Sequence, residues 1–314
     1  MIEKSKLIGD LNLKTPELNL RGFIHLNYSG CLLVDGKLFM IHSMKILISN
    51  IEYITLRILR KFIVKERFIN KYKKFIPYYL PSQNELSPSP IVDKYWGYCN
   101  LKNVSLLSKN ILEIGNGSTN STGYEIVGRW NAYYYGYEPF AELNIALDRK
   151  LYEDIKMKYK TLKKNNIMRI KNLEDIQSNS IDLILSNSVL EHVNNIDSLF
   201  VSLKRILKDD GCMIHIVDYR DHFFKYPFHF FQFSERAWNS FLNPGDLPRW
   251  RIFHHINFFK KYGFIVDIIC QEYDEQSFSF IEKKLHTDFT NYTKKELSVT
   301  AAVLFVYKER RKLS

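Results

Sequence analysis

From about residue 110 onward, apolar and polar positions alternate in blocks that have the periods of strands and helices. Short runs of β-branched and aliphatic residues are typical of buried strands, whereas apolar residues spaced three and four positions apart are typical of amphipathic helices. The pattern predicts strands at 111–114, 132–137, 167–170, 181–186, 212–217, 264–271 and 298–307. It predicts helices after residue 120 and at 141–164, 189–207 and 251–262.

Strands and helices in this alternating order indicate an α/β fold, with a mostly parallel sheet covered by helices on both faces. In such Rossmann-like sheets, ligands bind beyond the carboxyl ends of the strands, near the point where the strand order reverses. We therefore expect the functional side chains to follow the ends of the first strands.

The first 90 residues have a different pattern. Short apolar runs between turn-forming residues predict a small hairpin within 1–43, and from about 44 to 75 the spacing becomes helical. A segment rich in proline and serine, 80–90, then separates this N-terminal extension, 1–90, from a larger domain at 91–314. The apolar face of the helical stretch consists of Leu47, Ile51, Ile54, Ile58 and Phe62.

Positive charge is concentrated in the same region. Residues 1–110 carry 17 Lys and Arg against 8 Asp and Glu, so they hold +9 of the net charge of +11. A basic amphipathic helix either packs its apolar face on the rest of the protein, which is the more common case, or lies on an anionic membrane surface. The remaining residues are nearly neutral, which argues against a nucleic-acid groove built into the larger domain.

Composition excludes several other classes of protein. The four cysteines are far apart and form no CxxC pair, so we expect neither a metal site nor a disulfide framework. The N-terminus lacks the apolar segment of a secretion signal, and no run of eighteen uncharged apolar residues could span a membrane. We expect a cytoplasmic protein, with peripheral contact at the inner membrane face through 44–75 as an open alternative.

The most specific motif lies where the first strand of the larger domain ends. Residues 111–117 read Ile-Leu-Glu-Ile-Gly-Asn-Gly, an apolar strand that contains Glu113 and is followed by Gly115 and Gly117. Glycines at such a turn let the backbone approach a ligand that a side chain would obstruct. A dinucleotide fingerprint would need a third glycine at position 120, which is Asn120.

The second predicted strand ends in a carboxylate, Glu138, about twenty residues after the glycines. A carboxylate at this place accepts hydrogen bonds from ribose hydroxyls in nucleotide-binding folds. Together, the glycine turn and Glu138 predict a site for a cofactor that contains a nucleoside.

These residues resemble the first two motifs of class I S-adenosylmethionine-dependent methyltransferases, of which the first is written hhE/DhGxGxG. The similarity continues in the same order along the chain. Segment 180–193 is similar to FDLVxSxxVLEHV, 203–218 to the following helix, LKPGG-type turn and strand, and 260–264 to an EAGF turn. The resemblance therefore covers roughly residues 90–308, about two thirds of the chain.

The resemblance implies a seven-stranded sheet of order 3-2-1-4-5-7-6, with the last strand antiparallel, and S-adenosyl-L-methionine as the methyl donor. It implies that the donor lies against the backbone near Gly115 and Gly117, with the Glu113 carboxylate behind them. It also implies that Glu138 binds the ribose.

Further donor contacts are implied for Ser186 and Asn187, in the loop after the fourth strand. Counting back from Asp182 assigns the adenine contact to Asn172, where the family usually has an acidic residue. The resemblance also implies that His192 lies close to the donor, so this histidine is a secondary catalytic candidate.

Beyond the fifth strand, residues 217–224 resemble a DLxDHF segment of methyltransferases of this subtype. His222 is the candidate general base toward a hydroxyl group, with Asp218 or Asp221 orienting its ring. Alternatively, Arg220 neutralises the aspartates and the segment is a salt-bridged loop.

The insertion at about 218–250 is dense in aromatic residues and carries Arg236 and Arg249, with Arg251 just after it. As a lid over the acceptor, it would stack on sugar rings or hold a lipid, and its arginines would pair with phosphate or carboxylate. Alternatively, it is a helical cap with a small core of its own.

We expect O-methylation of a hydroxyl-bearing small molecule or glycan intermediate, because the DLxDHF segment and 233–238 look like those of bacterial surface-polysaccharide methyltransferases. One alternative is a nucleic-acid methyltransferase recruited by the basic N-terminal region. Against it, Ser-Asn-Ser-Val at 186–189 occupies the place of the NPPY or DPPY motif. Another alternative is a donor-binding scaffold without turnover.

Overall fold

The computed structural model describes residues 50–63, 87–221, 227–243 and 247–309. The predicted N-terminal hairpin and Leu47 lie outside these ranges. Within them, no helix is both long enough and apolar enough to cross a membrane.

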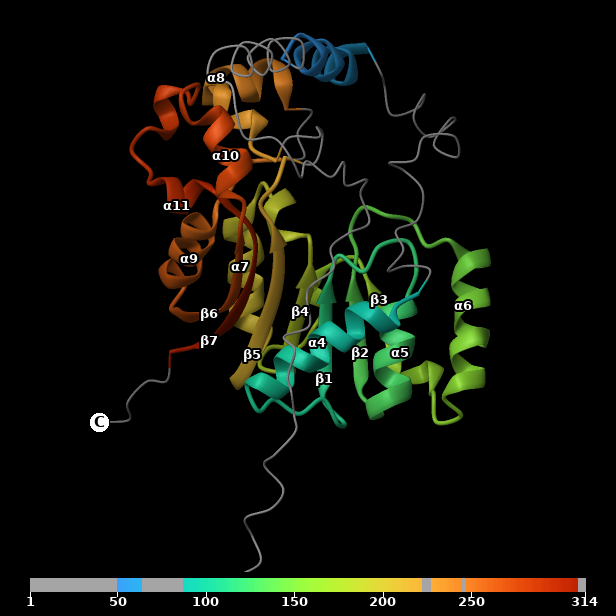
Figure 1. Cartoon of the computed structure of the whole chain (residues 1–314). Coiled ribbons are helices and arrows are strands. Elements are labelled where there is room, and N and C mark those ends of the chain that lie inside the picture. The colour runs from blue at the N-terminus through green and yellow to red at the C-terminus, as the bar shows by residue number, and fades with distance from the viewer. Residues whose placement is uncertain (1–49, 64–86, 222–226, 244–246, 310–314) are drawn as a thin grey trace, which may run out of the picture. The chain divides into compact units, whose positions relative to one another are not determined.

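In the described part of the chain, seven strands form one sheet with the order β3-β2-β1-β4-β5-β7-β6 (Figure 1). Strands β1 to β5 pair in parallel, whereas β7 pairs antiparallel with both β5 and β6. The predicted Rossmann-like α/β fold and its strand order are confirmed. The strands are β1 (Asn110–Ile114), β2 (Tyr133–Tyr137), β3 (Ile167–Ile170), β4 (Ile181–Asn187), β5 (Leu207–Asp218), β6 (Phe264–Tyr273) and β7 (Val299–Lys308).

Helices cover both faces of this sheet. On one face α4 packs on α5 and α5 packs on α6, and on the other face α7 packs on α9. The helices are α4 (Ser89–Leu101), α5 (Ser121–Trp130), α6 (Ile145–Lys158), α7 (Ile196–Ile206) and α9 (Ile252–Lys261). Short 3-10 turns form η4 (Lys164–Asn166), η5 (Leu173–Asp175) and η6 (Leu190–His192).

Alternate side chains of β1 face opposite helical layers, as the period of a strand requires. Leu112 and Ile114 are buried in the core that includes Phe200 of α7 and Phe259 of α9. Glu113, between them, faces α4 on the other side of the sheet, where it meets a tyrosine. The strand therefore carries an acidic residue into a buried layer.

The predicted helices at 141–164 and 189–207 are shorter in the structure, because asparagine side chains cap the first turns of α6 and α7. Asn144 accepts a hydrogen bond from the backbone N–H three residues further on at 3.2 Å, and Asn195 does the same at 3.3 Å. Apolar periodicity alone does not locate such caps.

A second hydrophobic core lies beyond the carboxyl end of β5 and is built from three segments that are far apart in the sequence (Figure 1). A helix at 50–58, continued by η1 (Leu59–Ile63), contributes Tyr53, the segment after β5 contributes Trp238, and the segment between β6 and β7 contributes Phe278. We call this assembly the aromatic cap. Its other elements are η7 (His229–Gln232), α8 (Glu235–Ala237), η8 (Trp238–Leu242), α10 (Glu275–Glu282), η9 (Thr287–Phe289) and α11 (Lys294–Leu297).

From Ile51 onward, the helix at 50–58 and the residues after it belong to the same compact unit as the sheet. Its buried face carries Tyr53 and Arg57, which are 0% and 2% exposed. By contrast, Ile51, Ile58 and Phe62 of the predicted apolar face are exposed by 62%, 38% and 56%. These three residues of the predicted apolar face therefore do not pack on the rest of the described protein.

Candidate active site

The turn after β1 depends on glycine geometry. Gly115 and Gly117 have φ values of +74° and +66°, a region that residues with a Cβ rarely adopt. A Cβ on Gly115 would also lie 2.5 Å from Cγ2 of Val189, a distance far below van der Waals contact. The turn thus exposes backbone rather than side chain at the carboxyl end of β1.

Glu138 lies directly beside this turn. One carboxylate oxygen accepts a hydrogen bond from the Gly117 N–H at 3.2 Å, and the other accepts from the N–H groups of Phe140 and Ala141 at 3.0 Å each. An ionised carboxylate has about four acceptor positions. Three are occupied, which leaves acceptor capacity for a hydroxyl of a bound ribose.

Arg169 of β3 holds the same turn through its backbone carbonyl groups. Its Nη2 donates to the carbonyl oxygens of Gly117 at 2.7 Å and Ala141 at 2.9 Å. Nothing in the local sequence around Arg169 indicated this role, because the contact spans 52 residues. The glycine turn is therefore held by one acidic and one basic side chain.

Glu113 lies behind the turn, in the buried layer under α4. Tyr134 and Tyr95 donate hydrogen bonds to its carboxylate, the latter at 3.3 Å. Burial raises the pKa of Glu113 to about 7, although hydrogen bonds from Tyr134, Tyr95 and Thr122 oppose the shift. The Glu113 side chain connects β1, β2 and α4 and lies behind the turn. It would therefore influence a bound donor only through the position of the turn.

The other predicted donor contacts lie in different environments. Asn172 is exposed and precedes η5, and Asn187 is half-buried at the end of β4. Ser186 is buried, with its Oγ 2.7 Å from Nδ1 of His215 in the layer below α9. Its hydroxyl is engaged inside the core, so a donor contact there would use the backbone. His192 is half-buried in η6, and its role stays a prediction.

The segment after β5 is held by two ion pairs. Arg220 binds Asp218 through its Nη2 at 2.6 Å and through its Nε at 2.9 Å. Asp221 is paired with Arg57 at 3.2 Å and accepts a hydrogen bond from the hydroxyl of Tyr53 at 2.9 Å. His222, the predicted base, lies outside the described residues.

These pairs favour the salt-bridged interpretation for the aspartates, with one difference. Arg220 accounts only for Asp218, whereas the partner of Asp221 comes from the helix at 50–58, across 164 residues of sequence. Sequence reasoning missed Tyr53 and Arg57. Their spacing of four on one helix face was the only available signal.

Two arginines expected to meet an acceptor have structural roles instead. Arg249 is 3% exposed and donates to the carbonyl oxygens of Phe230 and Phe233 at 2.8 Å each. Arg251 is fully buried and donates to the carbonyl oxygen of Leu297 at 2.8 Å, and burial lowers its pKa to about 9. Both hold the aromatic cap together, so neither is placed to pair with an acceptor anion.

The strand order, the glycine turn after β1 and the carboxylate after β2 are those that the sequence resemblance to S-adenosylmethionine-dependent methyltransferases implied. A comparison with family models agrees, because residues 112–215 match the family described as "Methyltransferase domain". The structure therefore has the Rossmann-like fold of methyltransferases, and a segment of about a third of the chain matches a methyltransferase domain.

Solved structures with a similar fold share little sequence with this chain. Phosphoethanolamine N-methyltransferase 2 of Haemonchus contortus, in complex with S-adenosyl-L-methionine, is 13% identical with a TM-score of 0.47, over 80% of this chain and 59% of that one. The YcgJ protein of Bacillus subtilis is 12% identical with a TM-score of 0.42, over 73% and 100%. A putative sarcosine dimethylglycine methyltransferase of Galdieria sulphuraria is 14% identical with a TM-score of 0.44, over 71% and 86%. No curated protein matches the chain.

The residues present fit S-adenosylmethionine. The positive φ at Gly117 brings side-chain-free backbone against Glu138, and that carboxylate keeps capacity to accept from a ribose. For metals, no group of three or more His, Cys, Asp or Glu side chains able to hold an ion occurs among the described residues.

Proposed function

We propose that the protein transfers the methyl group to a hydroxyl of a small molecule or glycan intermediate. The observation that carries this proposal is the location of the aromatic cap. The cap and residues 219–221 follow the carboxyl end of β5. The glycine turn and Glu138 follow the carboxyl ends of β1 and β2, at the same edge of the sheet (Figure 1). An acceptor bound under the cap would face the donor across this edge.

Bound S-adenosylmethionine supplies an electrophilic methyl group, so the chain must position the acceptor and remove its proton. His222 is the proposed base. The buried histidines nearby are poor proton acceptors, because burial lowers the pKa of His215 and His255 to about 3 and that of His229 to about 4. Asp218 is already paired with an arginine, so its proposed task is to hold the segment beside His222.

Transfer of label from a methyl-labelled donor to a panel of sugars, sugar nucleotides, phenols and amines tests the acceptor class. We expect label on hydroxyl-bearing acceptors, and we expect His222→Ala to slow transfer while leaving donor affinity unchanged. His286→Ala, a half-buried histidine of the cap paired with Asp288, is the matched control. Label on amines alone, or equal turnover in wild type and His222→Ala, would contradict the proposal.

Calorimetry with S-adenosylhomocysteine tests the ribose contact independently of the acceptor. Glu138→Ala should cost at least about 1–3 kcal/mol of binding free energy, because it removes the charge-assisted bond to the ribose together with the three backbone hydrogen bonds that hold the turn. Glu142→Ala removes a carboxylate from the same loop whose side chain is 84% exposed, and it should bind as wild type does. Equal affinities for all three proteins would remove Glu138 from the donor site.

Methylation of nucleic acid is the alternative function, and one surface favours it. Residues 145–171, which include α6, the edge strand β3 and the segment between them, carry nine Lys and Arg against three Asp and Glu. Filter binding to RNA and DNA over a range of salt concentrations tests this alternative, since phosphate contacts weaken steeply with salt. Tight, salt-sensitive binding together with label transfer to nucleic acid would replace the small-molecule proposal.

We also propose that residues 1–90 are an extension to the methyltransferase domain at 91–314, and that 44–75 contacts a membrane surface from the cytoplasm. The exposed Ile51, Ile58 and Phe62 support the second point, because an interfacial helix buries such residues in the lipid headgroup region. Co-sedimentation with vesicles of anionic and of neutral lipid tests it. Equal absence from both pellets would contradict membrane contact.

A further inference from the structure

A pocket lies on the α6 side of the sheet. It has a volume of about 350 Å³ and lies between the first turns of α5, the helix α6 and the edge strand β3. Neither the glycines of the turn nor any other residue predicted to contact the donor lines it. Its size is within the range of small-molecule sites.

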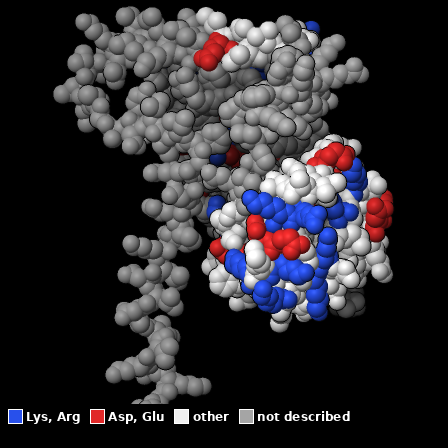
Figure 2. Space-filling view, turned by 90° about the vertical axis from the view of Figure 1, so that its right-hand side faces the viewer, with Lys and Arg blue, Asp and Glu red and all other residues white. Residues whose placement is uncertain are grey.

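Three cationic side chains line this pocket: Arg149 of α6, Lys164 of η4 and Arg169 of β3. Within the described ranges, neither Arg149 nor Lys164 forms an ion pair. The surrounding face is also basic. Figure 2 shows Lys and Arg side chains gathered over the face that carries α6.

Two acidic residues also line the pocket, but one of them already accepts hydrogen bonds from neighbouring groups of the protein. Asp148 accepts hydrogen bonds from the Asn120 N–H at 2.7 Å and the Tyr124 hydroxyl at 2.6 Å, so it caps α5. Glu153 is exposed on α6. The lining therefore keeps a net positive charge.

Arg169 is the residue that points to a ligand. Its Nη2 is used by the glycine turn, whereas its Nη1 is buried and has no hydrogen-bond partner among the described residues. A buried donor without a partner costs free energy, and in a pocket a bound acceptor removes this cost. Guanidinium groups match the oxygen geometry of phosphate well.

The remaining walls are partly apolar. The ring of Tyr152 packs edge-on against Tyr124 with centroids 5.2 Å apart, and the Lys164 ammonium lies 5.2 Å from the centre of the Tyr152 ring. Leu143, Ile145 and Ile167 complete the apolar part of the wall. A ligand with one anionic end and a flat or cyclic body would use both kinds of surface.

We propose that this pocket binds the phosphate group of a small phosphorylated molecule, at a site separate from the donor and acceptor sites. Arg149 and Lys164 bind the phosphate oxygens, and the Arg169 side chain shifts so that its buried Nη1 reaches them. Tyr152 and Tyr124 contact the rest of the molecule. Three cations around one group fit the double charge of a phosphate monoester better than a carboxylate.

Titration of the full-length protein with inorganic phosphate, followed by calorimetry and ³¹P NMR, tests the site without any assay of methyl transfer. We expect saturable binding of one phosphate. Lys164→Gln and Arg149→Gln should each weaken it about tenfold, since each removes a charge-assisted contact. All the altered side chains are exposed, so thermal unfolding should be unchanged.

The matched controls are Lys163→Gln and Lys150→Gln, which remove the same charge from neighbouring exposed residues that do not line the pocket. They should bind phosphate as wild type does. No saturable binding would overturn the proposal, and so would an equal loss in all four variants, which would indicate only a general attraction of the basic face. Tighter binding of a nucleic-acid duplex than of phosphate, weakened equally by all four changes, would indicate a nucleic-acid surface instead.

Discussion

Gly115 combines two constraints that are usually separate. Its φ of +74° disfavours any Cβ, and the space that a Cβ would enter is filled by Val189 of the turn after β4. The first constraint belongs to the residue itself, and the second to a side chain 74 positions away. A substitution of Gly115 should therefore alter the turn whose backbone is predicted to contact the donor.

Gly115→Ala is expected to lower affinity for S-adenosylhomocysteine by about tenfold or more, because a left-handed alanine costs roughly 1–2 kcal/mol before any clash. Adding Val189→Ala removes the clash but not the φ cost, so it should restore affinity only in part. Gly97→Ala is the control, since a Cβ at that helical position meets nothing within 4 Å. Calorimetry that gives wild-type affinity for Gly115→Ala would contradict this account.

Glu113 makes stability depend on pH. Its pKa is raised from 4.5 to about 7 by burial, so the folded state binds the proton more tightly than the unfolded state does. The free energy of unfolding should therefore fall as pH rises from about 4.5 to 7, by about 3 kcal/mol if this group acts alone.

Urea unfolding of wild type and Glu113→Gln across that range measures this contribution. The variant cannot ionise, so the difference between the two proteins should increase with pH in favour of the variant. If the free energy of unfolding changed with pH in the same way for both proteins, the Glu113 carboxyl would have the same pKa in the folded and the unfolded state, and this account would be wrong. Glu142→Gln, an exposed carboxylate, controls for the change in net charge.

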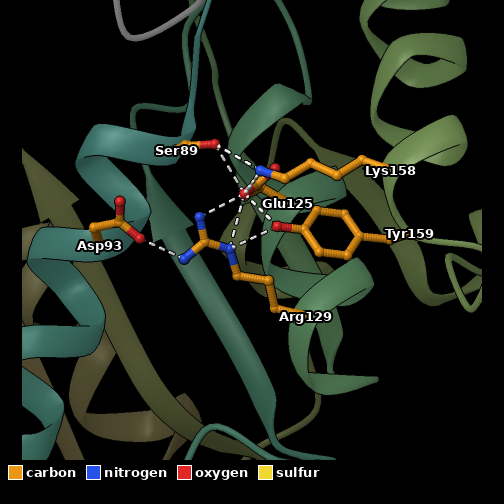
Figure 3. A network of polar contacts seen from close by, with 6 residues as sticks. All are labelled: Ser89, Asp93, Glu125, Arg129, Lys158 and Tyr159. Atoms are coloured by element: carbon orange, nitrogen blue, oxygen red, sulfur yellow. Dashed lines mark hydrogen bonds and ion pairs between the residues drawn. The ribbon is translucent and has the colours of Figure 1, made fainter.

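At the scale of elements, one buried carboxylate joins three helices. Glu125 of α5 is 1% exposed and accepts from Ser89 of α4 at 2.9 Å, from Lys158 at the end of α6 at 3.0 Å, and from Tyr159 at 2.8 Å (Figure 3). Arg129 adds an ion pair at 2.6 Å. Burial by itself raises the pKa of Glu125, but these hydrogen bonds outweigh it and the pKa is lowered.

Glu125→Gln should lower the free energy of unfolding by about 2 kcal/mol, because the amide accepts fewer bonds and leaves Arg129 partly unpaired. The difference in stability between the two proteins should shrink as pH falls below the usual carboxyl pKa of 4.5. In that range Glu125 is protonated in the unfolded wild type, so the wild type also loses the stabilisation that its ionised carboxylate provides. Asp154→Asn, an exposed change on α6, is the control for urea unfolding. Equal stability of both variants at pH 7 would contradict the role of this network.

The ends of the elements were the least predictable part of the fold. The periodicity predicted 251–262 closely, and the structure has α9 at Ile252–Lys261. It overextended the helix at 141–164, since polar residues after Lys158 still fit a helical spacing while Tyr159 is already extended. Hydrogen bonds of caps, rather than apolar spacing, decide where a helix stops.

At the scale of the whole molecule, the helix at 50–58 is tied to the candidate active site. Arg57 and Asp221 form an ion pair with side chains only 2% and 0% exposed, and Arg57 also lies 4.9 Å from the centre of the Trp238 ring. A boundary at residue 90 follows from composition, yet this helix contributes to the cap. The N-terminal extension thus includes a part that supports the segment after β5.

Arg57→Met should lower the free energy of unfolding by about 3 kcal/mol, because it leaves the Asp221 carboxylate buried without its cation. The double variant Arg57→Met with Asp221→Asn should recover part of this loss, since it removes the uncompensated charge. Thermal unfolding measures both, and Glu52→Gln on the exposed face of the same helix is the control. A double variant no more stable than Arg57→Met would show that charge compensation is not the cause.

The sequence by itself determined the order of the strands and helices, the sheet, and the glycine turn with Glu138, because strand and helix periods and turn residues are local properties of the chain. Only the tertiary structure decided that Asp221 pairs with Arg57, that Ser186 bonds to His215 inside the core, and that Arg169 braces the turn. These contacts join residues 29 to 164 positions apart. Their partners are chosen by packing and by the need to satisfy buried charge, for which no local pattern exists.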